Sequence, residues 1–566
     1  MSTTMVANRL GQGDLRHMQN RPQKSGQTSA FDRLRIPFSS QWKEWIWILS
    51  IGGAVCLAAS IPYLAGWYAQ TPESRYAWVG IMAGDSLSYF AKMGQGQQGQ
   101  WLFHLPYTAQ THAGIPIYTY YLFLGHIARW TALPIPLIFH LARVVNGLIL
   151  LLVIYLFIRQ LTEIKAERRF IFTLVAISSG LGWLAATIGV QSTDLTIPES
   201  NTFYTLMDNP HFPLSQALLL LIAMSYLFPP ATNRKMLIGE LSLVAIASIL
   251  LASLQPYMLI VTWGIALFYS IWLWWDNHRV PQAPMLRLVV SVVVGGAVVA
   301  MTAMALISDP LLQGWMNQNL TPSPAVFSYV SGYGLLLIPA AYGAIWAIRA
   351  RPQAGKVMLV WILVTLLAVY APTTIQRRFV SGAHVPLAIL AGLGICRVWM
   401  PRWGLMRRWA WAYLVLTCLT SVVIVLIVTR VTLANSASFF LSAEERQALA
   451  WLQEHAPPDG VVVSSPELGA FIPAFTSQRV VVGHWAETVD FAATSLQVQR
   501  FYSTASSSPA LCPELTEWGA NYLLVGPRER DIGATDLDAS AGSGLIKVAQ
   551  FNDVEIYQVD CALLRK

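Results

Sequence analysis

The chain has 566 residues, of which 55% are apolar and 12% are charged. Ordinary globular proteins carry roughly twice that charged fraction, so the composition indicates a polytopic α-helical membrane protein and excludes a water-soluble one. The net charge of +8 at pH 7 is explained by basic cytoplasmic loops, because Lys and Arg gather on the cytoplasmic side of membrane proteins. We therefore expect no nucleic-acid partner.

The first 41 residues are polar and basic and contain no apolar core followed by a cleavage site, which predicts a disordered cytoplasmic tail. Residues 42–433 contain about eleven apolar runs that are candidates to cross the membrane. The basic loops between these runs place the N-terminus in the cytoplasm and assign residues 69–136 to a large outer loop. Counting residues 115–133 as a span would place the basic segment 165–169 outside, so we expect 115–133 to form an interfacial helix on the outer surface.

From residue 434 onward the composition becomes that of a soluble α/β domain, which the alternation of spans places outside the cytoplasm. Ser442 followed by Glu445 predicts a capped helix. Short β-branched runs predict strands, and a final hairpin is expected. The runs are 461–465, 479–483 and 521–526, and the hairpin turns at Asn552-Asp553.

Five cysteines are present, and two of them, Cys512 and Cys561, lie in this polar part of the chain. No CxxC pair or histidine spacing indicates a metal site there. The two thiols could form a disulfide in an oxidising compartment, and the sequence leaves that question open.

Asp85 is the first candidate functional residue, because it stands alone among aromatic, amide and glycine residues in the segment 84–114. Tyr89 and Trp101 in the same segment offer ring faces on which a sugar could stack, and amides could bind sugar hydroxyls. A carboxylate in such a setting could accept a proton from an attacking hydroxyl. The alternative is an acid that is merely solvated.

Arg377 and Arg378 form a basic pair that the predicted topology places outside, against the usual distribution of positive charge. Guanidinium groups fit phosphate oxygens, so the pair is a candidate site for a polyprenyl-phosphate headgroup, with simple contact to lipid headgroups as the alternative. Arg143, near the outer start of a span, is a third candidate substrate-binding charge, and a structural ion pair is equally consistent with it.

The second outer loop, 192–216, carries acids and a histidine without any Lys or Arg, and these could hold Mg²⁺ or Mn²⁺ or could simply be solvated. Of this group we retain Glu199 as catalytic and His211 as substrate-binding, with Asp208 and His211 as weak metal candidates. Gln255 beside Pro256 is expected to line the same cavity or to satisfy freed backbone groups. The acids of the loop are Asp194, Glu199 and Asp208.

These motifs resemble those of the GT-C superfamily of membrane glycosyltransferases, such as the protein O-mannosyltransferases and the aminoarabinose transferases of lipid A. The resemblance implies an inverting transferase that uses a lipid-phosphate-linked sugar, with the first-loop acid as base. Many relatives carry two adjacent acids there, whereas Ser86 follows Asp85 here, so a second acid would come from Glu199 or Asp208. The matching residues are Gly84-Asp85, Tyr89, 99–102, 116–130, Arg143, Pro198-Glu199 and 209–211.

We therefore expect a cell-membrane glycosyltransferase of the cell envelope that moves a sugar from a polyprenyl-phosphate donor to a hydroxyl of a glycan, lipid or protein at the outer face. Membrane lipids are the other expected partners. Residues 483–488 of the outer domain are expected to cap the cavity or to shape its acceptor side. The alternatives are a transporter or lipid flippase, and a non-catalytic GT-C-like protein of envelope assembly.

Overall fold

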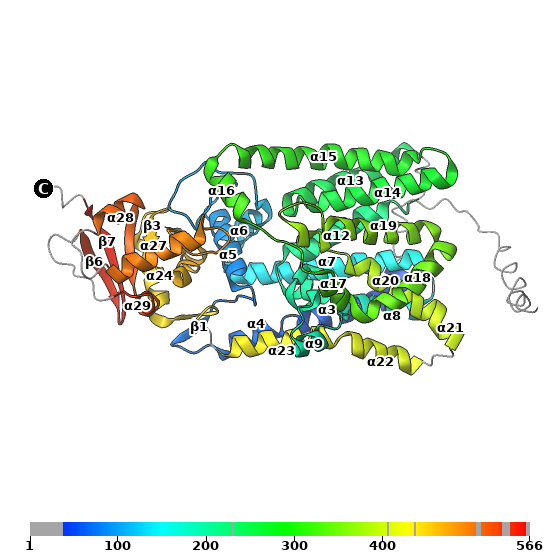
Figure 1. The fold of residues 1–566 in the computed structure, drawn as a ribbon, viewed down its shortest axis with the longest axis horizontal. Helices are drawn as coiled ribbons and strands as arrows, with labels where there is room; N and C mark the ends of the chain where they lie inside the picture. The colour runs from blue at the N-terminus through cyan, green and yellow to red at the C-terminus, as the bar shows by residue number, and fades with distance from the viewer. Residues whose placement is uncertain are drawn as a thin grey trace, which may run out of the picture.

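The computed structural model describes residues 38–228, 231, 233–403, 407–434, 437–504, 511–534 and 544–561. A long helical bundle occupies one end of the molecule and an α/β domain occupies the other (Figure 1). Of the expected tail, residues 1–41, only 38–41 are described, and they begin helix α3 (Phe38–Ala58). The rest of that tail lies outside the described residues.

Eight helical segments in the described part of the chain are long and apolar enough to cross a membrane, and a ninth is obtained if the bent pair α3 and α4 (Ile61–Ala69) is one span. Two shorter apolar helices, α12 (His211–Ser225) and α19 (Pro352–Ala368), lie among them. The expected count of about eleven therefore stays a prediction. The eight segments are Ile135–Leu161 (α7), Lys165–Ile188 (α8 and α9), Arg234–Leu254 (α13), Met258–Asn277 (α14), Gln282–Ile307 (α15), Val326–Ala350 (α17 and α18), Gln376–Trp399 (α20 with its flanking turns) and Arg408–Leu433 (α22 and α23).

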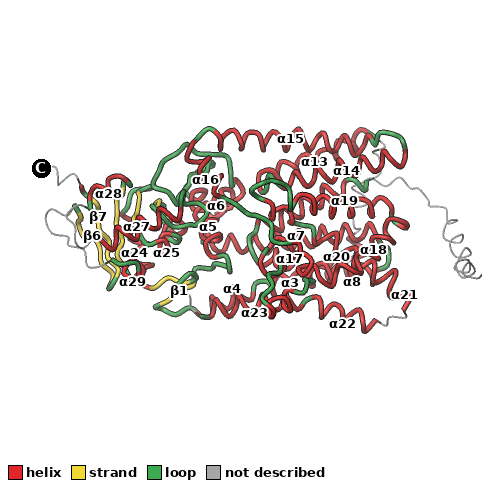
Figure 2. Tube along the Cα trace, viewed as in Figure 1, coloured by secondary structure: helices red, strands yellow, loops and turns green. Residues whose placement is uncertain are grey.

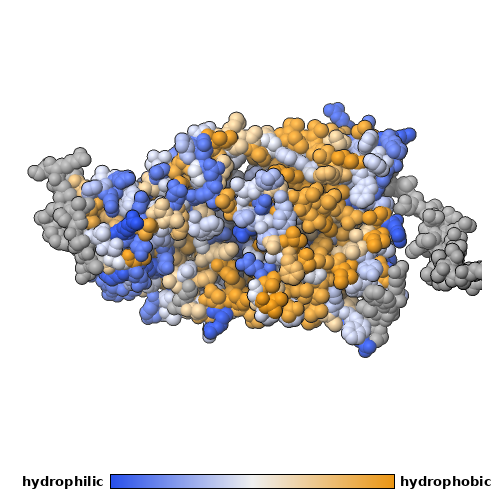
Figure 3. All heavy atoms as spheres, in the orientation of Figure 1, coloured by the Kyte–Doolittle hydropathy of each residue, from blue (hydrophilic) through white to orange (hydrophobic). Residues whose placement is uncertain are grey.

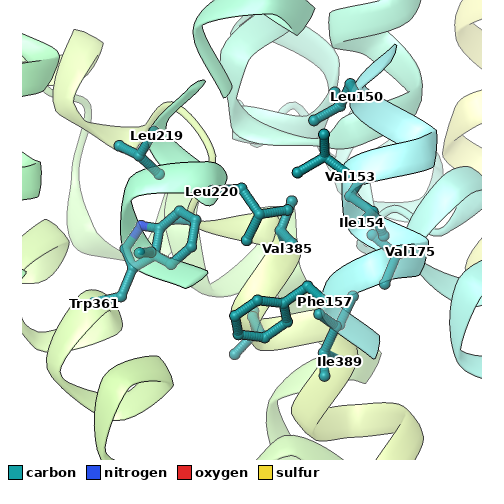
Figure 4. Packing of buried hydrophobic residues seen from close by; sticks show 14 of the residues in the cluster. Leu150, Val153, Ile154, Phe157, Val175, Leu219, Leu220, Trp361, Val385 and Ile389 are labelled. Carbon is teal, nitrogen blue, oxygen red and sulfur yellow. The ribbon is translucent and has the colours of Figure 1, made fainter. Parts of the chain in front are cut away.

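On the face shown in Figure 3, apolar residues cover the middle of the bundle, and hydrophilic residues gather towards both of its ends. At its centre lies α20 (His384–Gly394), every residue of which is buried. Gly343 and Gly394 allow α20 and α18 (Leu337–Ala350) to touch, since a Cβ at either glycine would lie within about 2 Å of a backbone oxygen of the other helix. Figure 4 shows the surrounding apolar core, in which Trp361 is 1% exposed.

The segment around Asp85, which the sequence assigns to the large outer loop 69–136, contains helix α5 (Ala83–Gln97) instead of irregular chain. In the sequence the glycines of this segment indicate a loop. In the structure they allow α5 to pack closely against α6 (Thr119–Thr131). A Cβ at Gly96 would lie 2.0 Å from the Leu122 oxygen, and one at Gly125 would lie 2.0 Å from the Met93 oxygen. Helix α6 has 13 residues, about 20 Å in length, and is not among the candidate spans.

The C-terminal domain contains a five-stranded sheet in the order β4–β3–β5–β7–β6, seen as the gathered strands in Figure 2. The three strands β4, β3 and β5 are parallel, and the hairpin β6–β7 closes the sheet antiparallel at Asn552-Asp553, as predicted. The strands are β3 (Val461–Val463), β4 (Arg479–Val480), β5 (Ala520–Val525), β6 (Leu545–Phe551) and β7 (Val554–Val559); the main helices are α24 (Ala443–His455), α27 (Phe491–Thr504), α28 (Cys512–Glu517) and α29 (Pro527–Asp531).

A further local prediction for this domain is confirmed. Ser442 and Glu445 form the reciprocal capping box that begins α24. The sheet domain is also tied to the first loop of the chain, because β1 (Ser74–Tyr76) pairs antiparallel with β2 (Phe440–Ser442). Cys512 and Cys561 form a disulfide, which answers the question that the sequence leaves open.

Replacing both Cys512 and Cys561 with Ser should destabilise the C-terminal domain by about 2–4 kcal/mol, because the disulfide restricts the unfolded chain across 49 residues. Thermal unfolding of the double variant, with the reduced wild type as its matched comparison, measures the loss. Reaction of either thiol with a maleimide in the native, unreduced protein would contradict the pairing.

Candidate active site

A cavity of about 150 Å³ is lined by residues of the bundle and of the C-terminal domain, including residues of α5 and α16 (Pro310–Gln318). Both helices are labelled in Figure 1. The cavity walls come from segments that are far apart in the sequence: helix α5, the second outer loop, the turn before α14, the turn before α20, and residues 484–487 of the C-terminal domain. Most of the predicted site residues line it: Asp85, Tyr89, Glu199, Asp208, His211, Gln255, Arg377 and Arg378.

Helix α5 supplies one wall through Asp85, Ser88, Tyr89 and Lys92, which are spaced so that they share one helical face. Asp85 lies in the first turn, where the helix dipole favours a negative charge, and its side chain is 37% exposed. Burial raises the pKa of the Asp85 carboxyl, but His484, Arg378 and Lys92 outweigh burial, so the pKa lies below its ordinary value. The carboxylate is therefore charged at neutral pH.

Lys92 is completely buried and joins α5 to the C-terminal domain. Its ammonium donates to Glu487 and to Ser88, and it lies 4.2 Å from the centre of the Tyr118 ring. Burial raises the pKa of Glu487, but the charge of Lys92 outweighs burial and holds that pKa below its ordinary value. The two side chains thus form a buried ion pair in the cavity wall.

Arg377 and Arg378 lie on the short turn Gln376–Val380, directly before the buried helix α20. The Arg377 backbone donates to the Thr321 oxygen at 3.1 Å, and the Arg378 guanidinium lies 5.9 Å from the centre of the Tyr257 ring. Neither guanidinium has a carboxylate within 4.0 Å among the residues that the structure describes. The turn therefore presents two positive charges to the cavity without a close counter-ion.

Glu199 and Asp208 add two further acids to the cavity. Burial raises the pKa of Glu199, although Arg378 and Arg377 oppose the shift. Burial, followed by the charges of Asp85 and Glu199, raises the pKa of Asp208 well above its ordinary value. Both carboxyls therefore favour the protonated form more than Asp85 does, and each can donate a hydrogen bond.

The described residues do not fit the divalent cation that the acids and His211 suggest. Among them, no group of three or more His, Cys, Asp or Glu side chains lies close enough to hold one ion. His211 shares a hydrogen bond of 2.6 Å with the Tyr121 hydroxyl through Nδ1, and Asp208 accepts one from Asn209 at 3.2 Å.

Two predicted substrate-binding residues do not line the cavity. Arg143 is buried and donates to the Leu206 oxygen and the Ser60 hydroxyl, both at 2.8 Å, which ties α7 to its neighbours. Trp101 is 54% exposed and stacks on His126 with ring centres 3.8 Å apart.

Several lining residues were missed in the sequence: Lys92, Tyr118, Tyr257, Trp315 and His484. The spacing of 85, 88, 89 and 92 was a usable signal, because these polar positions recur with the period of a helix. Treating the segment as a loop concealed that face. The sequence predicts that residues 483–488 lie at the cavity, but it does not single out His484 among them.

Comparison of the sequence with protein-family models finds no match, and comparison with curated proteins finds none either. Three solved structures are among those to which this chain is similar. The apo oligosaccharyltransferase of Archaeoglobus fulgidus is 12% identical, with 86% of this chain and 70% of that chain covered at a TM-score of 0.49. ArnT of Cupriavidus metallidurans, bound to undecaprenyl phosphate, is 14% identical. The match covers 90% of this chain and 99% of ArnT, with a TM-score of 0.48. The arabinofuranosyltransferase AftD from Mycobacteria is 14% identical. The match covers 90% of this chain and 40% of AftD, with a TM-score of 0.45.

The Archaeoglobus protein has also been solved with an inhibitory peptide and a dolichol-phosphate.

Replacing Glu487 with Gln should destabilise the protein by about 3–5 kcal/mol, because Lys92 would keep a buried charge without a counter-ion. The double variant Lys92→Met/Glu487→Gln should recover much of that loss, since no unpaired charge remains. Thermal unfolding measures both. Lys547→Met, which breaks a partly exposed ion pair, serves as the control and should change stability by less than about 1 kcal/mol. Additive losses in the double variant would contradict the pairing.

Proposed function

We propose that the protein is a membrane glycosyltransferase, which moves a sugar from a polyprenyl-phosphate donor to an acceptor hydroxyl at the outer face of the membrane. The observation that carries this proposal is one cavity that is lined by the charged carboxylate of Asp85 and by Arg377 and Arg378, whose guanidinium groups have no carboxylate within 4.0 Å among the described residues. A base and an anion-binding pair are the two parts that such a transfer needs.

Asp85 acts as the general base in this proposal. The acceptor oxygen attacks the anomeric carbon of the donor sugar, its proton passes to the Asp85 carboxylate, and the bond between the sugar and the phosphate breaks. Attack from the side opposite the phosphate inverts the anomeric centre. The lowered pKa of Asp85 keeps the carboxylate charged and ready to accept the proton at neutral pH.

Arg377 and Arg378 bind the phosphate of the donor and stabilise the charge that gathers on it as the sugar departs. Guanidinium groups match phosphate oxygens in a planar fork, and their effect is largest in a site partly shielded from water. Undecaprenyl phosphate, which the crystal structure of ArnT contains, is a ligand of this chemistry. The donor lipid carries the activated sugar, so the proposal requires no nucleotide site.

The second acid expected from the resemblance has two candidates in the cavity. Glu199 lies within the electrostatic reach of both arginines, and burial raises its pKa. We assign it the role of a protonated carboxyl that donates a hydrogen bond to the donor, since a second carboxylate beside a phosphate would repel it. Gln255 is 2% exposed, and its amide oxygen and nitrogen have no partner among the described residues, so it is suited to sugar hydroxyls.

The proposed location at the outer face has two supports. A disulfide such as Cys512–Cys561 persists in an oxidising compartment, which supports a location of the C-terminal domain and of the cavity beside it outside the cytoplasm. The loops at the opposite end of the bundle are rich in arginine and lysine, which favours the cytoplasmic side for that end. Among these basic residues are Arg234, Lys235, Arg279, Arg349 and Arg351.

Asp85→Asn should lower sugar transfer by about 10²–10⁴-fold, because the amide is isosteric with the carboxyl and cannot accept the proton. The measurement is transfer of labelled sugar from polyprenyl-phosphate donors to a membrane extract. Asp553→Asn, at an exposed turn of the C-terminal domain, is the matched control and should retain full activity. Transfer by Asp85→Asn at the wild-type rate would remove Asp85 from the role of base. Vectorial movement of the lipid without transfer would favour the flippase.

Replacing Arg377 and Arg378 together with Gln should weaken binding of undecaprenyl phosphate by at least about tenfold, because both unpaired positive charges are lost. Replacing both with Lys should recover only part of the affinity, since an ammonium cannot form the bidentate contact. Binding to the detergent-solubilised protein measures the change. Arg349→Gln removes an exposed charge at the opposite end of the bundle and should have no effect. Equal affinity in all four proteins would place the phosphate elsewhere.

A further inference from the structure

His484 of the C-terminal domain reaches into the first turn of α5. Its Nε2 atom lies 3.4 Å from Oδ1 of Asp85. The approach depends on Gly84, because a Cβ at that position would lie 3.3 Å from the imidazole ring. Two segments that are about 400 residues apart in the sequence therefore meet at the carboxylate.

The imidazole is held in one orientation. The Ala486 backbone donates to Nδ1 of His484 at 3.2 Å, so Nδ1 is an acceptor and the proton of the neutral ring lies on Nε2, which faces Asp85. The ring is 4% exposed and packs beside Tyr107, with ring centres 5.6 Å apart. Nε2 has no hydrogen-bond partner of good geometry among the described residues, which leaves Asp85 as the acid that it approaches.

The segment that carries His484 is anchored on both sides of the cavity. Glu487 is paired with Lys92 of α5. From α16 and the residue after it, Gln318 donates to the Thr488 oxygen at 2.8 Å and Asn319 donates to the Ala486 oxygen at 3.1 Å. The position of His484 relative to Asp85 is therefore fixed by side chains of the bundle as well as by its own domain.

We propose that His484 is a positioning residue, which donates its Nε2 proton toward Asp85 and holds this carboxylate in the orientation and charge state that the acceptor hydroxyl requires. The C-terminal domain then completes the active site and does more than cover it. The proposal rests on the function of Asp85 as the base of the transfer.

The charges around Asp85 explain why His484 matters among them. Lys92 comes from the same helix, but Glu487 offsets its charge. Arg378 comes from the turn before α20, and the proposed donor phosphate would engage it. Glu199 and Asp208 from the second outer loop oppose the charged form of Asp85. Among the described residues, His484 is the group in this set that forms a close pair with Asp85, with Nε2 3.4 Å from Oδ1.

The test is a pH titration of the Asp85 carboxyl by infrared spectroscopy of the full-length protein, without donor or acceptor. The band is assigned as the part of the carboxyl signal that Asp85→Asn removes. His484→Phe keeps a ring of similar size and removes the donor, so it should raise the Asp85 midpoint by about one pH unit or more. His484→Gln retains an N–H donor and should give a smaller shift.

His455→Phe is the matched control, because His455 is exposed on α24 of the same domain and stacks on Trp451, away from the cavity. It should leave the Asp85 midpoint unchanged. Thermal unfolding of each variant shows that the domain is still folded and docked. An unshifted Asp85 midpoint in a folded His484→Phe protein would overturn the proposal and leave His484 a packing residue.

The titration separates this proposal from the proposed function. If His484→Phe shifts the midpoint but Asp85→Asn still transfers sugar, the contact is real and Asp85 is not the base. If both the proposed function and this proposal are correct, the pH below which the transfer rate falls should be higher in His484→Phe than in the wild type. The sign follows because a base with a higher pKa is protonated, and inactive, at a higher pH.

Discussion

The buried ion pair between Lys92 and Glu487 is the interaction on which the candidate site depends. It joins the helix that carries Asp85 to the segment that carries His484, and both partners lie in the wall of the cavity. A fully buried ammonium is costly unless a counter-ion stays beside it, so the two parts of the molecule are held in register by electrostatics as well as by the pairing of β1 with β2. A cavity built between two domains needs such a constraint, because a small rotation of one domain would separate its walls.

Charge is distributed unevenly within this cavity. Asp85 stays ionised beside His484, whereas burial favours the protonated forms of Glu199 and Asp208. Carboxyl groups with different proton affinities in one site can take different roles, one accepting a proton and another donating a hydrogen bond. Arg377 and Arg378 lie on the turn before α20, and every residue of this helix is buried. The packing of α20 therefore limits the movement of the two guanidinium groups when a ligand binds.

Local patterns in the sequence predict local features well. The capping box at Ser442, the hairpin at Asn552-Asp553 and the short strands of the C-terminal domain follow from the neighbouring residues alone. Helix α5 was missed because glycine signals a loop in a single sequence, whereas Gly96 serves a contact with a helix that the sequence does not place beside it. The pairing of Lys92 with Glu487 spans 395 positions and leaves no periodic trace. Asp85, Arg377 and Arg378 could be singled out because each breaks an expectation of composition or topology, and their meeting at one cavity is a property of the fold.

The most direct measurement is the structure of the protein with undecaprenyl phosphate bound, determined by cryo-electron microscopy in a lipid nanodisc. The account predicts that the phosphate lies against the guanidinium groups of Arg377 and Arg378, with the Asp85 carboxylate across the cavity from it and room for an acceptor hydroxyl between them. A phosphate bound elsewhere, with Asp85 remote from it, would contradict the account.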